Sequence, residues 1–299
     1  MHRHGKTLLL INPVAGGGRA RRSAPHVTAL LRKHGIHLGV AESRDAQDVR
    51  AHAAGAAAAG FRNVAVLGGD GTLHHAVNAA LQTGVNFAFF PAGNGNDMAR
   101  GLGIPLDPIA AAYAFVRGHP RPVDLLRARF ACGETAHVLS ACGVGLDGQA
   151  ARLAATRFRR LPGAMRYVVA ALYALVGFKP LQMEVEWGEG NCFGPLPLAA
   201  VANGPSYGAG IRIEPAARMD DGLLNVVLVQ PLPVTRVLEA IPILLRDGNL
   251  RWPEIRRIRT RRVRLTPRDG SAAFHGDGEL SGTPPVEIEV APAATRFIY

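Results

Sequence analysis

The sequence predicts an α/β domain followed by a β-rich domain, and three observations support this. In the first 122 residues, short apolar runs alternate with amphipathic stretches, the pattern of successive β–α units. Beyond Pro120–Pro122, apolar runs of strand length are separated by Gly, Pro and Asn. The 299 residues also exceed the ~100–200 residues typical of one domain. We therefore expect a domain boundary between residues 122 and 123.

The elements of the first domain are predicted from hydrophobic periodicity and from the residues that end helices and strands. Apolar runs predict strands, and stretches with helical spacing that stop at a glycine, such as Gly35 and Gly60, predict helices. The predicted strands are residues 6–11, 37–41, 63–67 and 86–90. The predicted helices are residues 19–35, 45–59, 73–82, 97–102 and 108–116.

The second domain shows strands joined by turns, which is typical of a sandwich or barrel. The predicted strands are residues 123–130, 134–142, 182–187, 196–202, 223–228, 261–266 and 286–290. Two helices interrupt them, at residues 148–173 with a break near Pro162 and at residues 234–245.

Composition excludes several classes of protein. Hydrophobic residues make up 48% and charged residues 19%, so the chain is globular rather than disordered. Its 3 cysteines lack CxxC spacing, which argues against a disulfide framework or a zinc site and favours a reducing compartment. The apolar stretch 167–178 is shorter than the ~20 residues that span a bilayer. We expect a cytoplasmic protein.

The formal net charge of +11 comes mostly from arginine, which binds phosphate through two parallel hydrogen bonds. Nucleic acid, acidic lipid and nucleotide are all suitable partners, and an Arg-rich composition without a target is the alternative. The segment Arg251–Arg264 is especially basic. It is either a strand that touches phosphate head groups or a solvated strand face.

The segment Gly68–Thr72, with sequence GGDGT, lies between a predicted strand and a predicted helix. Its glycines allow close approach to a ligand, Thr72 is a candidate N-cap, and the helix N-terminus favours a phosphate. Asp70 would repel that phosphate unless a cation such as Mg²⁺ lay between them. A tight turn with a capping aspartate explains the same residues.

Two further loops are expected at the same edge of the sheet. The segments 12–18 and 91–97 also follow strands, and ligands of open α/β sheets bind beyond the carboxyl ends of the strands. The chain contains no GxxxxGK[ST] motif, which excludes a P-loop. In the second domain, Arg218–Leu223 suits either a metal site or a hairpin turn. The segment Phe274–Glu279 suits either a general base or a turn.

In this order, the motifs resemble the diacylglycerol kinase catalytic-domain superfamily, in particular its small soluble bacterial branch, which is related to sphingosine and ceramide kinases. The resemblance covers nearly the whole chain. The motifs that carry it are Asn12–Gly16 (NPxxG), Gly68–Thr72, Gly93–Arg100, Gly143–Asp147 (GxGxD), Asn203–Pro215, Asp220–Leu228 and Gly276–Glu279 (GDGE).

The resemblance implies an N-terminal α/β domain like those of phosphofructokinase and NAD kinase, a C-terminal β-sandwich-like domain, and a nucleotide in the interdomain cleft. The domains would be residues 1–122, which bind nucleotide, and residues 123–285, which bind the lipid. The segment 286–299 would return to the first domain.

The resemblance also implies an ATP- and Mg²⁺-dependent phosphorylation of a lipid hydroxyl and assigns residues to it. Asp277 would accept the proton of the hydroxyl, with Glu279 nearby and Asp70 also catalytic. The residues expected to bind ATP are Asn12, Pro13, Val14, Ala15, Gly16, Ser43, Gly68, Gly69, Asp70, Gly71, Thr72, Asn94, Asn96 and Asp97. Asp70 and Asp97 would hold the catalytic Mg²⁺. A structural Mg²⁺ would lie on the Asp221 carboxylate and the carbonyls of Arg218 and Leu223.

The sequence departs from the family pattern at two positions. Asn94 replaces the usual threonine, and His75 replaces a glutamate that commonly follows GGDGT. Ser43 is the substitute for a threonine that contacts nucleotide. These departures leave open a non-catalytic member of the family. An NAD kinase-like enzyme and an Arg-rich nucleic-acid-binding protein also stay open, although the chain carries no recognised nucleic-acid-binding motif.

The partners follow from the same observations. We expect a lipid substrate, whose identity the sequence does not give, and peripheral contact with an anionic membrane through residues 167–178 and the arginines before them. Contact with nucleic acid is not expected, and an exposed strand edge would support a homodimer.

Overall fold

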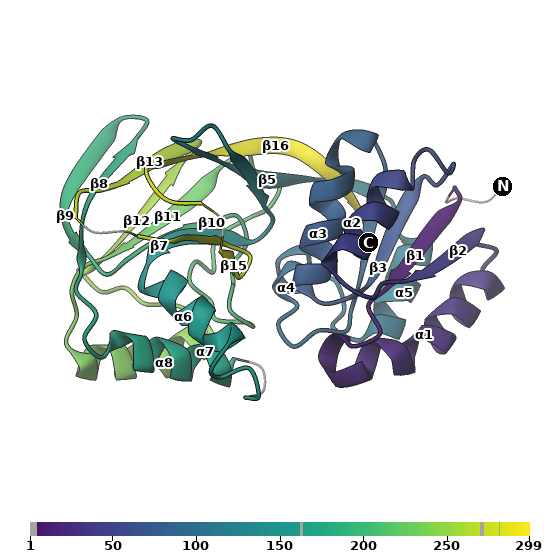
Figure 1. Ribbon diagram of the computed structural model, residues 1–299, viewed down its shortest axis with the longest axis horizontal. Coiled ribbons are helices and arrows are strands. Elements are labelled where there is room, and N and C mark those ends of the chain that lie inside the picture. The colour runs from purple at the N-terminus through teal and green to yellow at the C-terminus, as the bar shows by residue number, and fades with distance from the viewer. Residues whose placement is uncertain (1–4, 162–163, 270–271, 281) are drawn as a thin grey trace. The chain divides into compact units, whose positions relative to one another are not determined.

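In a computed structural model of the chain (Figure 1), residues 5–161, 164–269, 272–280 and 282–299 are described. The chain forms two compact units. Unit 1 consists of Met1–Val123 and Ala293–Tyr299, and unit 2 of Asp124–Pro292. Among the described residues, no helix is long and apolar enough to cross a membrane.

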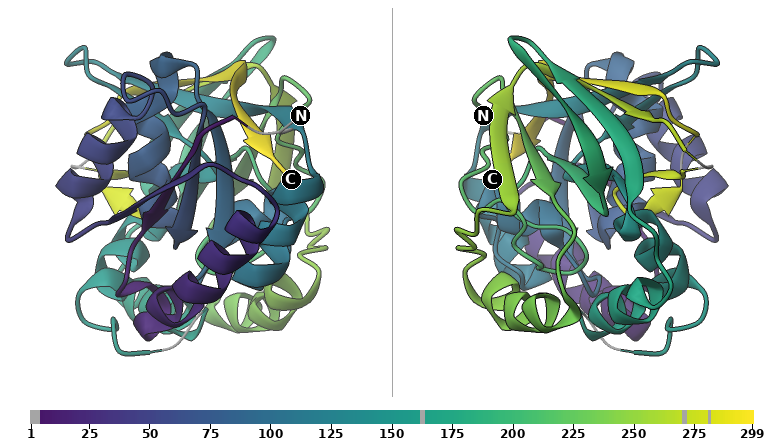
Figure 2. Two further views of the ribbon diagram at one scale, coloured as in Figure 1. Left: turned by 90° about the vertical axis from the view of Figure 1, so that its right-hand side faces the viewer. Right: turned by 90° about the vertical axis from the view of Figure 1, so that its left-hand side faces the viewer.

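Unit 1 is built on a parallel sheet in the order β2-β1-β3-β4, which the end of β16 extends. Strands β1, β3 and β4 are buried because helices cover both faces of the sheet, whereas the edge strand β2 is partly exposed. Helices α2 and α3 pack together on one face, and α1 and α5 on the other (Figures 1 and 2). The strands are β1 (Thr7–Ile11), β2 (Leu38–Glu42), β3 (Asn63–Gly68), β4 (Asn86–Pro91) and β16 (Val286–Ile298).

The helices of unit 1 confirm the predicted alternation, with changes at their ends. They are α1 (Ala15–Lys33), α2 (Ala46–Gly55), α3 (Asp70–Ala80), the 3₁₀ helix η1 (Leu81–Thr83), α4 (Asp97–Leu102) and α5 (Pro108–Arg117). Thr72 was expected to cap α3, but the helix begins at Asp70 and its N-cap is Gly69. The expectation was wrong because the glycine itself takes the extended cap conformation.

Unit 2 contains two antiparallel sheets. One contains part of β5 and β16 with β6, β13, β8 and β9, and the other has the order β12-β11-β10-β7-β14-β15. The elements are β5 (Pro120–Phe130), β6 (Thr135–Val138), β7 (Ala141–Gly145), β8 (Leu181–Trp187), β9 (Gly190–Leu196), β10 (Leu198–Ala202), β11 (Leu224–Val229), β12 (Ile255–Thr260), β13 (Arg262–Pro267), β14 (Phe274–Gly276) and β15 (Glu279–Leu280).

A single apolar core joins the two sheets of unit 2, since it draws on Phe130 and Val185 from one sheet and on Val226 and Phe274 from the other. The unit is therefore a β-sandwich, as predicted. The predicted strand 134–142 is wrong in detail: the chain breaks at Leu139–Ser140, between β6 and β7. Strands β9, β14 and β15 were not predicted, because each is short or rich in glycine and polar residues.

Three helices belong to unit 2: α6 (Leu146–Ala155), α7 (Met165–Leu175) and α8 (Val234–Arg246). Helix α6 packs on α7 through alanines of both helices. The predicted helix 148–173 is therefore two helices. Pro162, where we expected the break, lies outside the described residues.

Candidate functional site

The three loops expected at one edge of the first sheet do meet there. They follow β1, β3 and β4, which are parallel neighbours, so their carboxyl ends share one edge. The Asn12 side chain donates to the Thr72 hydroxyl at 2.8 Å and joins the first loop to the second. The Gly68 carbonyl accepts the backbone N–H groups of Ala92 and Gly93, which joins the second loop to the third.

Two glycines are required where these loops touch. A Cβ on Gly93 would lie 2.6 Å from the Gly69 Cα. Gly16 has a φ of +57°, and a Cβ there would lie 1.9 Å from the Ala92 carbonyl oxygen. Any side chain at these positions would push the loops apart. The two glycines are therefore needed for the close spacing of the loops, and not only for backbone flexibility.

Asp70 holds the third loop against the second. Its two carboxylate oxygens accept the backbone N–H groups of Asn96 at 2.5 Å and of Met98 at 3.2 Å, at the N-terminus of α4. Asn96, which has a left-handed backbone, accepts the Gly93 N–H and donates to the Gly93 carbonyl. Asp70 therefore caps a helix that begins 27 residues further along the chain, a role that the sequence did not indicate.

The carboxylates of Asp70 and Asp97 interact electrostatically, and both residues are buried or nearly so. Burial is the larger cause, and the Asp97 charge the second, of a rise in the pKa of Asp70 to about 7; hydrogen bonds from the α4 backbone oppose it. Two adjacent carboxylates in this setting suit an oxygen-seeking divalent cation, which would favour the charged form of both. The two carboxylates therefore supply part of the oxygen donor set that the predicted Mg²⁺ would need.

Of the other residues predicted to bind nucleotide, some side chains are exposed and one is buried. Asn94 is exposed beside the loops, and so is the Val14 side chain. Ser43 is buried after β2, and its hydroxyl donates to the Ile11 carbonyl at 3.2 Å. His75 lies on α3 with its Nδ1 3.2 Å from an Arg50 guanidinium nitrogen. Ser43 is thus held by the backbone, whereas Asn94 is available to a ligand.

In unit 2, Asp277 occupies a turn between β14 and β15 with a φ of +53°. One carboxylate oxygen accepts the Leu139 N–H at 2.7 Å and the other the Ser140 N–H at 2.8 Å. The break between β6 and β7 supplies these two donors. These two N–H donors fix the direction of the carboxylate. Glu279 is exposed on β15.

The turn Arg218–Leu223 is held by protein partners. Asp221 accepts the Leu223 N–H at 3.1 Å on one oxygen and the Arg259 guanidinium at 2.6 Å on the other, while Asp124 accepts the Gly222 N–H at 2.7 Å. In the described part of the chain, no three His, Cys, Asp or Glu side chains cluster as metal ligands. The predicted structural Mg²⁺ therefore fits this turn only if Arg259 releases the carboxylate.

Sequence reasoning missed a buried polar cluster next to Asp277. His275 Nδ1 lies 3.7 Å from Asp147 Oδ2, and both side chains are almost fully buried. Burial raises the pKa of Asp147, and His275 opposes the rise. The GxGxD motif was the available signal, because Gly143 leaves room for this carboxylate: a Cβ there would lie 2.3 Å from Asp147 Oδ2.

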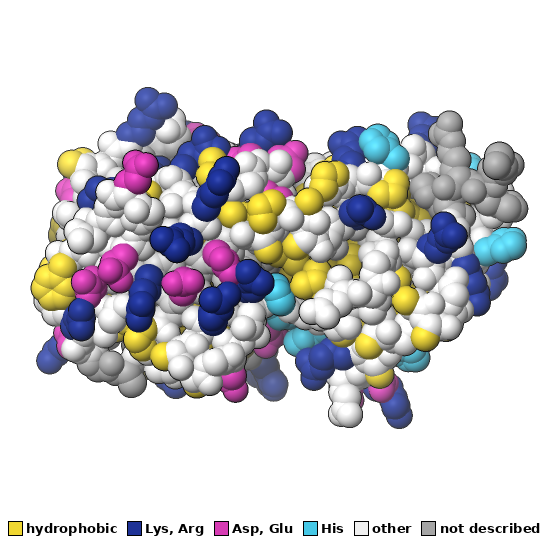
Figure 3. Space-filling view, turned by 90° about the horizontal axis from the view of Figure 1, so that it is seen from above, with side chains coloured by type: hydrophobic (Ala, Val, Ile, Leu, Met, Phe, Trp, Pro, Cys, Tyr) yellow, Lys and Arg dark blue, Asp and Glu magenta, His cyan; other side chains and the backbone are white. Residues whose placement is uncertain are grey.

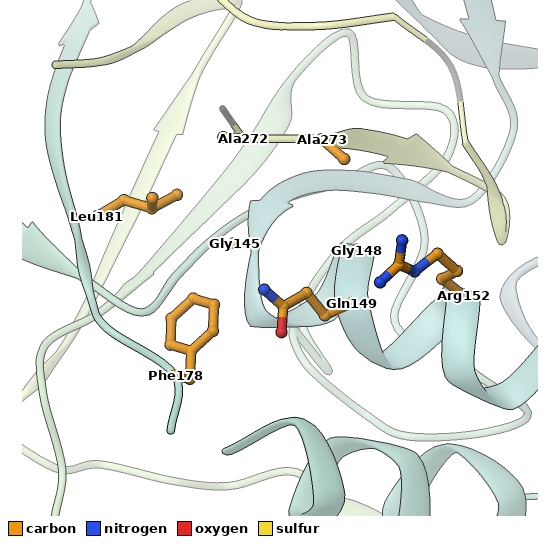
Figure 4. Close-up of a pocket in the computed structure, with 8 residues that line it drawn as sticks. All are labelled: Gly145, Gly148, Gln149, Arg152, Phe178, Leu181, Ala272 and Ala273. Atoms are coloured by element: carbon orange, nitrogen blue, oxygen red, sulfur yellow. The ribbon is translucent and has the colours of Figure 1, made fainter. Parts of the chain in front are cut away.

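A pocket of about 310 Å³ opens beside α6 within unit 2. Gln149 and Arg152 extend from α6 toward Phe178 and Leu181 (Figure 4). Ala272 and Ala273, which directly precede β14, complete part of its wall. The lining combines apolar carbon with one guanidinium.

Comparisons with known proteins agree with this architecture. Residues 6–128 match the diacylglycerol kinase catalytic domain, and residues 140–299 match the YegS C-terminal NAD kinase beta sandwich-like domain. A diacylglycerol kinase of Mycobacterium tuberculosis is 31% identical, with 99% of this chain and 96% of the relative covered. A protein of Shewanella frigidimarina named "probable lipid kinase YegS-like" is 27% identical, with 90% of this chain and 86% of the relative covered.

Solved structures show the same fold. A crystal structure of a diacylglycerol kinase from Bacillus anthracis aligns with a TM-score of 0.77 at 20% identity and covers 100% of this chain and 98% of its own. The family matches and the relatives define the chain as a two-domain phosphotransferase. The chain belongs to the family of diacylglycerol kinases and YegS-like lipid kinases, which confirms the resemblance seen in the sequence.

Proposed function

We propose that the protein transfers the γ-phosphoryl group of ATP to the hydroxyl of a lipid, in a Mg²⁺-dependent reaction. The observation that carries the proposal is the interlocking of three glycine-rich loops beyond β1, β3 and β4, through Asn12–Thr72 and Asp70–Asn96. Phosphoryl transfer depends mainly on positioning and charge neutralisation, and rigid loops rich in backbone N–H groups provide the former.

The nucleotide would bind in unit 1. The N-terminus of α3 begins at Asp70, so its unpaired N–H groups and dipole favour a phosphate beside Gly68–Thr72. The exposed Asn94 amide would contact the nucleotide in place of the usual hydroxyl. The nucleotide's expected place in an interdomain cleft stays a prediction, as does a homodimer.

Asp70 and Asp97 would hold the Mg²⁺ ion, which would supply neutralisation of charge on the phosphate oxygens. Asp70 serves two ends in this arrangement. It fixes the N-terminus of α4 with its carboxylate oxygens and brings its charge next to Asp97, so the same contacts that build the loop also build the cation site.

Asp277 would accept the proton of the lipid hydroxyl. The N–H groups of Leu139 and Ser140 fix its carboxylate, and a fixed acceptor makes proton transfer to a positioned base efficient. The nearby Glu279 side chain is exposed to solvent, and this difference favours Asp277 as the base. The pocket beside α6 is a candidate for part of the lipid.

We propose diacylglycerol as the acceptor, since two relatives that match over most of this chain carry that name. The test is phosphate transfer from radiolabelled ATP with Mg²⁺ to diacylglycerol, phosphatidylglycerol, sphingosine or NAD⁺, the lipids being in mixed micelles. We expect labelled diacylglycerol and a loss of about 10²–10⁴-fold in rate for Asp277→Asn, with Glu279→Gln close to wild type.

Different results in this assay would point to different functions. Labelled NAD⁺ would favour an NAD kinase-like enzyme, and labelling of another lipid would correct the acceptor. Nucleotide binding without labelling of any acceptor would contradict the proposal and favour a non-catalytic member of the family. Salt-sensitive binding of random duplex DNA without transfer would favour a nucleic-acid-binding protein.

A further inference from the structure

Two helices of unit 2 expose large apolar side chains along one stripe each. On α7 and the residue that follows it, Met165, Tyr173 and Val176 are exposed. On α8, Val234, Leu238 and Leu245 are exposed. The spacing within each stripe is that of residues on one helical face. Each stripe therefore runs nearly the whole length of its helix.

The fully buried residues of both helices are small, and their larger apolar residues are half-buried or exposed. The buried residues of α7 are Ala170 and Ala174, and that of α8 is Ala240. Ala170 packs against Ala150 and Ala154 of α6. If the outer face of each helix met only water, polar residues would be expected there and the large apolar residues would point toward the rest of the unit. The exposed stripes therefore indicate a surface that meets an apolar environment.

Positive charge surrounds the α7 stripe. No Asp or Glu occurs between Gln149 and Gln182, and the cations in that segment are Arg152, Arg157, Arg159, Arg160, Arg166 and Lys179. The Arg157 guanidinium lies 4.8 Å from the centre of the Tyr173 ring. A cation beside an exposed aromatic ring suits the boundary between head groups and acyl chains.

Helices α7 and α8 lie along the same edge of unit 2, as both Figure 1 and Figure 2 show. The face seen in Figure 3 is on the other side of the unit, and there basic and acidic side chains are interspersed. Ion pairs such as Arg129–Glu287 and Arg268–Glu184 belong to the sheet of β5, β8, β13 and β16. Exposed apolar area and excess positive charge thus coincide at α7, whereas on α8 the charges of Arg236 and Arg246 are balanced by Glu239 and Asp247.

We propose that the exposed stripes of α7 and α8, with the arginines around α7, dock on the surface of an anionic phospholipid bilayer. The proposal rests on the proposed function, because a kinase acting on a lipid hydroxyl must reach a membrane. Apolar side chains enter the boundary of head groups and acyl chains, and the cations contact lipid phosphates. The excess of basic residues favours this occupant over a second copy of the chain, which would bring the same charges together.

The Arg-rich segment around β12 is less suited to this role. Arg257 pairs with the buried Glu214 at 2.9 Å and Arg259 pairs with Asp221 at 2.6 Å. The Arg256 guanidinium lies over the Trp187 ring. Because carboxylates of unit 2 already pair with Arg257 and Arg259, we place the membrane contact on the helices instead.

The test is sedimentation of the full chain with vesicles of phosphatidylcholine, with and without phosphatidylglycerol. We expect wild type to bind the anionic vesicles in a salt-sensitive way. The variant Val176→Ser/Leu238→Ser/Leu245→Ser should bind at least tenfold more weakly, and Arg159→Glu/Arg160→Glu should lose the preference for anionic vesicles. Phe193→Ser on β9 removes an equally exposed apolar side chain of unit 2 and should bind like wild type.

Kinase activity distinguishes this proposal from the proposed function. The triple variant should phosphorylate a short-chain diacylglycerol in detergent micelles as wild type does, and fail on a long-chain diacylglycerol in vesicles. No vesicle binding by wild type, or equal binding by wild type and the triple variant, would overturn the docking proposal whatever the activity in micelles. A change in the oligomeric state of the variant without a change in vesicle binding would overturn it in favour of a second copy.

Discussion

The carboxylate of Asp70 accepts the backbone N–H of Asn96 at 2.5 Å, although 26 positions separate the two residues in the chain. The contact joins the loop after β3 to the N-terminus of α4. It also brings the charge of Asp70 next to that of Asp97. The same side chain therefore fixes the shape of the loop and introduces an unfavourable interaction between two buried carboxylates.

That unfavourable interaction predicts a dependence of stability on pH. The pKa of Asp70 is raised to about 7 in the folded protein, from an unfolded value near 4, so the folded state binds more protons between those values. The free energy of unfolding should then fall as the pH rises through this range, by at most about 1.4 kcal/mol per pH unit for this group. Urea unfolding from pH 5 to 8 in a chelator measures it.

Asp97→Asn provides the comparison for this measurement, because it removes the neighbouring charge and keeps the size of the side chain. The difference in stability between the variant and wild type should grow in favour of the variant as the pH rises. Added Mg²⁺ should reduce the fall in wild type. A difference that does not change with pH would show that the two carboxylates do not interact.

Gly93→Ala should destabilise unit 1 by about 1–3 kcal/mol, because its Cβ would lie 2.6 Å from the Gly69 backbone. The matched control is Gly55→Ala at the end of α2, where nothing lies within 4 Å of the added carbon and alanine favours the helix. Chemical unfolding compares the two variants, and nucleotide binding should be lost in the first alone. Similar stabilities would refute the close approach of the two loops.

His275→Gln should cost more stability at pH 8 than at pH 5. Without His275, burial raises the pKa of Asp147 further, so the folded state binds its proton over a wider range and loses stability as the pH rises. Breaking a buried pair costs about 3–5 kcal/mol when the remaining group is charged. Adding Asp147→Asn should remove the extra dependence on pH, and a loss that is equal at both pH values would contradict an electrostatic role.

Arg257→Ala should lower the free energy of unfolding by about 1–3 kcal/mol, because it leaves the buried Glu214 carboxylate without its guanidinium. Arg261→Ala, which removes an exposed arginine of the same basic segment, should change it by less than about 0.5 kcal/mol. Thermal or urea unfolding separates a structural role of this segment from a membrane role. If the two substitutions changed the free energy of unfolding equally, the basic segment would be interpreted as a solvated strand face without a structural role.

The turn at Asp221 predicts competition between a guanidinium and a cation. Arg259→Ala frees one oxygen of Asp221, so Mg²⁺ should raise the Tm of this variant more than that of wild type. Adding Asp221→Asn to the Arg259→Ala variant should abolish that gain in Tm. Adding Asp220→Asn instead, which alters the exposed neighbour paired with Arg218, should leave the gain in place. A Tm shift that is the same in all four proteins would argue against a structural Mg²⁺ at this turn.

Much of this molecule followed from local sequence. The alternation of elements in unit 1 and the glycine-rich segments after β1, β3 and β4 were predicted, because hydrophobic periodicity and the turn chemistry of glycine are local properties. The position of Asp277 in a turn was predicted for the same reason, whereas Asp70, which was expected before the helix, is the first residue of α3. Strands β9, β14 and β15 were missed, since short strands in glycine-rich or polar segments depend on their neighbours rather than on their own composition.

The sequence by itself determined which residues follow each strand of unit 1, and therefore which loops share an edge of its sheet. The tertiary structure decided what those residues touch. It set Asp70 on the N-terminus of α4, gave Asp277 the backbone donors of Leu139 and Ser140, and engaged Asp221 with Arg259. It also left the large side chains of α7 and α8 exposed. These contacts join residues far apart in the chain, and their energies depend on burial and on precise distance, which no local pattern contains.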